Sequence, residues 1–138
     1  MQRAFVVSGS NNVNAGLRVG EPTVLESVSS SEEYAVVFED DGEAGYFYAL
    51  EMANEERPIQ AAVSIYDVVK VSDRDIPSKL TIRWSRDQCK AGLWINDYPH
   101  AVFDFAAKRG YSRSNFPPPD KWKSHDFSWD DRALSFFD

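Results

Sequence analysis

Apolar and polar residues alternate along several short stretches of the chain, which predicts a fold built mainly from β-strands. The alternation is clearest in three segments, 79–85, 90–96 and 100–106, joined by the short connections RDQC and DYP. We therefore expect a three-stranded antiparallel meander whose second turn is made by Tyr98 and Pro99. Its third strand presents three apolar residues on one face, Ala101, Phe103 and Phe105.

The N-terminal half carries further strand patterns. Residues 3–7 are β-branched and aromatic, and 23–29 form a possible strand, whereas the Gly-, Asn- and Ser-rich segment 8–22 predicts a loop. Residues 33–52 predict a hairpin with its turn at Asp40, Asp41 and Gly42. Segment 59–71 fits either a helical stripe or an alternating strand, and its β-branched content favours the strand.

The C-terminal part is different in character. Three prolines at 117–119 exclude a strand ladder or a helix interior there. A short helix follows if Ser128 is its N-cap and Asp131 completes the capping spacing. We expect a β-rich α+β fold with an antiparallel meander sheet and a short C-terminal helix. It would be one domain over 1–138, divided into a β-rich core (1–116) and a Pro-rich connection with a helix or tail (117–138).

Length and composition support a self-sufficient core. The chain has 138 residues, of which 43% are hydrophobic, so folding needs neither a disulfide nor a metal. Cys89 is the single cysteine, which excludes an intramolecular disulfide and a cysteine-rich zinc site. No segment approaches the roughly 20 apolar residues of a membrane span, and we expect a cytoplasmic protein that does not bind membranes.

Negative charge is concentrated in the first half of the chain. The formal net charge is −7, made up of −8 over residues 1–60 and +1 over residues 61–138. Such a field disfavours nucleic acid and favours a basic partner protein, although it can also serve solubility alone. The acidic residues that we expect to contact a basic partner are Glu32, Glu33, Asp40 and Asp41.

A catalytic constellation is hard to find. His100 and Asp104 share a strand face about 13 Å apart, too far for a direct hydrogen bond without a bulge. Cys89 lies in a turn without an obvious base, and the acidic pairs do not have calcium-loop spacing. We therefore predict no metal and no cofactor. An alternative remains a small-molecule site or small enzyme with a pocket near four residues, His100, Asp104, Arg109 and Tyr111.

Aromatic residues suggest binding surfaces instead. Trp94 shares its strand face with Gly92 and Asn96, so it is either an exposed interface anchor or part of the core, depending on the strand register. Aromatic and basic residues interleave over 108–122, which would suit nucleic acid, but the overall charge makes that partner unfavourable. A homodimer through Trp94 or the apolar C-terminal tail is a further possibility.

Two long stretches, 65–85 and 90–119, resemble a bacterial family known as domain-of-unknown-function family 2251. The specific parts are YPHAVFDF (98–105), KRGY (108–111) and NFP (115–117), and the resemblance covers roughly 46–119. It implies a bacterial source and a single small domain, and it implies no activity and no catalytic residues. The segment SRSNFP departs from the family pattern, which has a cysteine near position 112.

The sequence therefore favours a non-catalytic protein-binding module. Its concrete form is an immunity-type or regulatory protein whose acidic half neutralises a basic partner. This hypothesis depends on the uneven charge and on the missing catalytic constellation.

Overall fold

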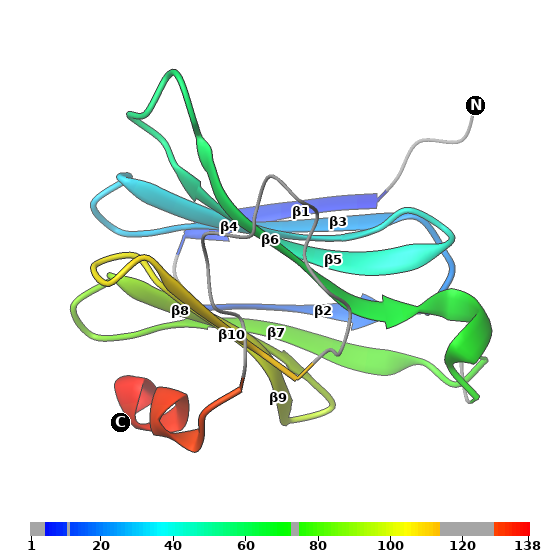
Figure 1. Cartoon of the computed structure of the whole chain (residues 1–138). Helices are drawn as coiled ribbons and strands as arrows, with labels where there is room; N and C mark the ends of the chain where they lie inside the picture. The colour runs from blue at the N-terminus through cyan, green and yellow to red at the C-terminus, as the bar shows by residue number, and fades with distance from the viewer. Residues whose placement is uncertain (1–4, 11, 73–74, 114–128) are drawn as a thin grey trace.

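In the described residues, ten β-strands form two five-stranded sheets that face each other (Figure 1). The structure is a computed structural model, and it describes residues 5–10, 12–72, 75–113 and 129–138. The first sheet has the order β1-β3-β4-β5-β6, with bounds Phe5–Ser10, Thr23–Val28, Tyr34–Asp40, Ala44–Glu51 and Ile59–Asp67. The second has the order β10-β9-β8-β7-β2, with bounds Arg109–Ser112, Tyr98–Asp104, Lys90–Ile95, Ser78–Trp84 and Val13–Leu17.

The predicted β-rich class and the antiparallel meander β7-β8-β9 are confirmed. The hairpin β4-β5 and the strand at β6 are confirmed too. The other strand pairs are also antiparallel, apart from β1 and β3, which run parallel. The predicted α-helical component is not found in the described residues, whose helices are two 3₁₀ segments, η1 (Val68–Lys70) and η3 (Asp131–Phe137).

The predicted loop at 8–22 is wrong. Strand β1 extends to Ser10, and β2 pairs with the edge of β7 in the opposite sheet. Side chains in β2 do alternate, with Leu17 buried and Asn14 and Gly16 exposed. The Gly- and Asn-rich composition makes this alternation hard to recognise in the sequence. Pairing with the backbone edge of β7 outweighs the low strand propensity of these residues.

A single apolar cluster fills the space between the two sheets. Its largest fully buried members include Phe38 and Leu25 of the first sheet and Leu80, Ile82 and Leu93 of the second. Phe103 and Phe105 join it, as their alternation predicted. Burial of this apolar surface is the main stabilising contribution that holds the sheets face to face.

The turn between β8 and β9 lies two residues earlier than predicted. Asn96 and Asp97 both have positive φ, 52° and 65°, as a mirror-type two-residue hairpin turn requires. Tyr98 and Pro99 instead belong to β9, opposite Ile95 and Trp94. Asn and Asp tolerate the left-handed region of backbone conformation. The turn therefore forms at Asn96 and Asp97 rather than at Tyr98 and Pro99.

The C-terminal 3₁₀ helix packs against the outer face of the second sheet (Figure 1). Asp130 caps it, since its side chain accepts a hydrogen bond from the Arg132 backbone N–H. Three residues per turn place Ala133 and Phe136 on one side, and both pack against Tyr111 and its neighbours. The predicted N-cap, Ser128, and the proline run lie outside the described residues.

Candidate functional site

Two tyrosines project from the outer face of the first sheet. On β5, Phe47 and Ala49 point into the core, so Tyr46 and Tyr48 alternate to the outside, where both are half-buried. Their ring centroids lie 6.1 Å apart. In register, Tyr46 is opposite Glu39 of β4, and the Tyr48 hydroxyl donates a 3.5 Å hydrogen bond to Glu39 Oε1.

We call this surface the tyrosine face. Around the two tyrosines of β5 it consists of half-buried residues from β3, β4 and β6, namely Val24, Glu26, Val37, Glu39, Ala62 and Ser64. The described helix η3 lies against the other sheet, and no described helix is drawn over this face (Figure 1). The tyrosine face thus offers half-buried aromatic and apolar surface that no described helix covers.

Several carboxylates lie at one end of the tyrosine face, near Tyr46. Burial raises the pKa of Tyr46, and the charges of Asp41, Asp67, Glu43 and Glu39 raise it further. Burial and the Glu39 carboxylate raise the pKa of Tyr48 to about 12. Both phenols therefore remain neutral hydrogen-bonding groups at physiological pH, within a strongly negative field.

Basic residues are scarce near this face. Residues 19–69, which contain β3 to β6, carry twelve acidic side chains and one basic side chain, Arg57. In the described chain Asp41, Glu43 and Asp67 form no ion pair. No ion pair among the described residues therefore offsets the charge of these three carboxylates.

The four acids predicted from the sequence are separated by the fold. Glu32 and Glu33 lie in the exposed turn before β4, while Asp41 lies in the turn after it. A seven-residue strand therefore holds these two groups roughly 20 Å apart. Asp41 accepts hydrogen bonds from the backbone N–H groups of Glu43 and Ala44, so it also shapes its own turn.

Asp40 is not a surface residue, and its predicted role in contacting a partner is wrong. It is 1% exposed and accepts three hydrogen bonds. The Gly20 backbone N–H and the Tyr66 hydroxyl donate to Oδ2 at 2.7 and 2.6 Å, and the Gly42 N–H donates to Oδ1 at 2.8 Å. The Asp40 carboxylate therefore has a structural role: its hydrogen bonds connect the turns at Gly20 and Gly42 with β6.

Trp94 lies on the outer face of the second sheet, yet it is 8% exposed. Phe137 packs edge-on against its ring at 4.9 Å, and the Arg83 guanidinium lies 5.4 Å from the ring centroid. Of the two alternatives for Trp94, the exposed anchor is not found, because the C-terminal helix covers the ring. The homodimer through Trp94 or the C-terminal tail stays a prediction.

His100 and Asp104, which were named for the alternative small-molecule pocket, lie apart on β9, His100 near its start and Asp104 at its end. A bulge does occur at His100, because Leu93 pairs with Ala101 and Trp94 with Pro99. Even so, His100 stacks edge-on with Tyr98 at 5.4 Å, and burial followed by the nearby Arg113 charge lowers its pKa. Asp104 is buried at the other end of β9, where it accepts a hydrogen bond from the Ala107 N–H.

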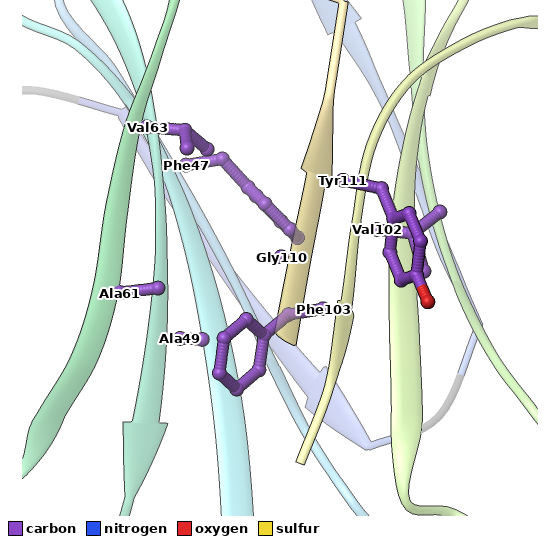
Figure 2. A pocket seen from close by; sticks show the side chains of 8 residues that line it. All are labelled: Phe47, Ala49, Ala61, Val63, Val102, Phe103, Gly110 and Tyr111. Atoms are coloured by element: carbon purple, nitrogen blue, oxygen red, sulfur yellow. The ribbon is translucent and has the colours of Figure 1, made fainter. Parts of the chain in front are cut away.

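Arg109 and Tyr111 are likewise engaged within the fold. The Arg109 guanidinium lies 4.4 Å from the Tyr111 ring centroid, and Tyr111 also contacts Phe136. Tyr111 borders a crevice between the sheets, but Figure 2 shows its side chain pointing away from the interior, beside Val102.

That crevice is lined by Phe47, Ala49, Ala61, Val63, Val102, Phe103, Gly110 and Tyr111. Its volume is about 10 Å³, room for a single water, whereas ligand sites usually measure hundreds of Å³. The crevice therefore does not provide the pocket predicted near His100, Asp104 and Arg109.

Two further searches of the described residues are negative. Metal-binding groups of three or more His, Cys, Asp or Glu side chains are not found there. Helices long and apolar enough to cross a membrane are also not found among them.

Comparison with known proteins identifies the family. Residues 17–138 match the family described as "Uncharacterized protein conserved in bacteria (DUF2251)". The chain belongs to this family. The resemblance predicted from residues 46–119 is thus confirmed and extends over a longer part of the chain.

One curated relative is an uncharacterized protein of Haemophilus influenzae, 48% identical over 89 residues. The match covers 64% of this chain and 55% of the relative, so it spans only about half of the relative's length. No solved structure matches this chain.

Sequence reasoning missed Tyr46, Tyr48, Glu39, Glu43 and Asp67 as members of one surface. The alternation in GYFYALE (45–51) was a usable signal, because it places two tyrosines opposite Phe47 and Ala49. The carboxylates could not be added without the strand register, since they come from different segments of the chain.

Proposed function

We propose that this protein is a non-catalytic binding module that engages a basic partner protein through the tyrosine face. The observation that carries the proposal is the pair Tyr46 and Tyr48 on a sheet face that no described helix covers. At one end of this face lie three carboxylates, Asp41, Glu43 and Asp67, that form no ion pair in the described chain. Its concrete form is an immunity-type or regulatory protein that neutralises its partner.

The chemistry of the face supports a protein partner. Tyrosine is one of the residues most often found at energetically important interface positions, because it combines a large rigid ring with a hydrogen-bonding hydroxyl. The tyrosine face is an open face of a sheet, which suits another protein better than a small molecule, because a small molecule needs a concave site.

The charge supports a basic partner. Complementary charge increases the association rate and selects among partners, and it does so most strongly at low salt. Asp41, Glu43 and Asp67 at the edge of the face would meet lysines or arginines, while the two rings fill the centre.

Two matched double variants test the proposal. Glu43→Lys with Asp67→Lys reverses charge beside Tyr46, whereas Glu55→Lys with Glu56→Lys makes the same change of net charge in the exposed β5-β6 connection. Tagged wild-type protein and both variants would be used to capture partners from lysate of the bacterial source, at low and at high salt. Each captured partner would then be purified and its affinity measured.

We expect one basic protein to bind the wild type and the Glu55/Glu56 variant, and to bind the Glu43/Asp67 variant at least about tenfold more weakly at low salt. Tyr46→Ala should weaken the same complex at both salt concentrations, because the loss of ring contact is not screened. Equal weakening by the two double variants would refute a specific role for the tyrosine face.

A further inference from the structure

A polar groove lies on the other sheet, away from the tyrosine face. Its volume is about 310 Å³, and its walls are formed by Asn12, Asn14, Lys79, Thr81, Arg83, Trp94 and Asp97. These residues come from β2 and the position just before it, from β7 and β8, and from the β8-β9 turn. The groove is within the size range of small-molecule sites.

The two asparagines present hydrogen-bond donors. Asn12 Oδ1 accepts a 2.9 Å hydrogen bond from the Trp84 backbone N–H, and Asn14 Oδ1 accepts a 2.8 Å hydrogen bond from the Thr81 hydroxyl. With both carbonyl oxygens in use, the remaining polar group of each side chain is its NH₂. These NH₂ groups have no acceptor within the described chain.

Arg83 and Trp94 add further donors. The Arg83 guanidinium lies 5.4 Å from the Trp94 ring centroid, and in the described chain it makes no hydrogen bond or ion pair. The Trp94 indole N–H also has no acceptor there.

Lys79 supplies a second positive charge. Its Nζ pairs with Asp97 Oδ1 at 2.7 Å, and both side chains are more than half exposed. Asp97 is the one acidic group among the groove residues, and it leaves two N–H donors of Lys79 available. The groove therefore combines two cations with several neutral donors.

We propose that this groove binds the phosphate group of a small molecule. A phosphate has three terminal oxygens that accept several hydrogen bonds at once. Its negative charge suits the Arg83 guanidinium and the N–H donors of Lys79 that Asp97 leaves available, although Asp97 reduces the net charge of the groove residues to +1. A small molecule fits better than nucleic acid, because the chain's net charge of −7 repels a polyanion. The site is independent of the binding function proposed for the tyrosine face.

Titration with inorganic phosphate, followed by NMR, tests the site directly. We expect phosphate to shift the side-chain NH₂ signals of Asn12 and Asn14 and the indole N–H signal of Trp94. Acetate, the carboxylate probe, should shift the same signals at higher concentration. Folding of each variant would be checked from its own spectrum.

Two charge-matched variants separate specific binding from screening. Arg83→Gln removes the guanidinium from the groove, whereas Arg86→Gln removes the same charge from the exposed β7-β8 turn. We expect Arg83→Gln to weaken phosphate binding about tenfold, the value of one charge-assisted hydrogen bond, and Arg86→Gln to leave it unchanged. Asn14→Asp, which adds a carboxylate to the groove, should abolish the phosphate-dependent shifts of the Asn12 NH₂ and Trp94 indole N–H signals.

Three outcomes would overturn the proposal. The first is an absence of phosphate-dependent shifts at these side chains in folded protein. The second is equal weakening by Arg83→Gln and Arg86→Gln, which would mean general charge screening. The third, tighter binding of acetate than of phosphate, would exclude a phosphate as the preferred group.

Discussion

The hydroxyl of Tyr66 on β6 donates a 2.6 Å hydrogen bond to Oδ2 of Asp40 on β4, across the intervening strand β5. Gly45 of β5 lies between them in register. A Cβ at Gly45 would lie 2.6 Å from the Tyr66 ring, so only glycine lets that ring cross the strand. Burial, and then this hydrogen bond, raises the pKa of Tyr66, which keeps the phenol a donor to Asp40.

Replacing Tyr66 with phenylalanine should destabilise the fold by about 1–3 kcal/mol, because the buried Asp40 carboxylate loses a donor. Urea unfolding measures the change. Tyr46→Phe is the matched control, since no hydrogen bond of the Tyr46 hydroxyl is found in the described chain, and it should leave the free energy of unfolding nearly unchanged. Similar losses in both variants would contradict this account of Asp40.

Gly92→Ala should loosen the C-terminal helix. The new Cβ would lie 2.6 Å from Trp94 Cζ3 and 3.1 Å from Phe137 Cζ, so both rings must move. We expect a loss of about 1–3 kcal/mol in the free energy of unfolding and faster proteolysis of residues 129–138. Gly16→Ala is the control, because a Cβ there meets no atom within 4 Å. Unchanged proteolysis of Gly92→Ala would show that the helix does not depend on this contact.

Asp87 should titrate at an unusually low pH. Hydrogen bonds from the Ser85 hydroxyl, the Cys89 backbone N–H and the Lys90 ammonium lower its pKa from 3.8 to about 2. Since the folded-state pKa is the lower one, the stabilisation is fully present above about pH 4 and is lost as the pH falls through about 2. Side-chain carboxyl NMR would measure this pKa directly.

The energetic effect of Asp87 should be small, because its side chain is 56% exposed and solvent screens the charge. Asp87→Asn should cost less than about 1 kcal/mol at neutral pH. The difference between variant and wild type should shrink toward pH 2. A pKa of Asp87 near 3.8 would show that the turn does not hold the three donors in place.

Tyr48 should ionise only in strongly alkaline solution. Burial is the main cause of its pKa of about 12, and the Glu39 carboxylate is the next. Glu39→Gln should therefore lower the pKa part of the way toward 10.0, leaving the burial contribution. Ultraviolet absorbance titration of wild type and variant, with Tyr48→Phe to assign the signal, provides the measurement. An unchanged value in Glu39→Gln would mean that Glu39 does not face the phenol.

The candidate surfaces show where sequence reasoning succeeded and failed. The acidic character of the first sheet was predictable, because it depends only on which residues occupy 19–69. The grouping of Glu32, Glu33, Asp40 and Asp41 was not, because β4 separates two turns and one carboxylate is buried. Proximity in the sequence is a poor guide to proximity on a sheet, where neighbours come from other strands.

Taken alone, the sequence determined the local elements. Alternation specified the meander β7-β8-β9, and the Asp-Asp-Gly turn specified the β4-β5 hairpin, because both depend on residues a few positions apart. It also determined the excess of carboxylates in the first half of the chain.

Only the tertiary structure decided which faces became interior and which surfaces formed. It placed β2 on the edge of β7, covered Trp94 with Phe137, and brought Asn12, Asn14 and Arg83 to one groove. The physical reason is that these contacts join segments dozens of residues apart. Their stability comes from apolar burial between the sheets and from backbone pairing between strands of one sheet, which local sequence patterns do not encode.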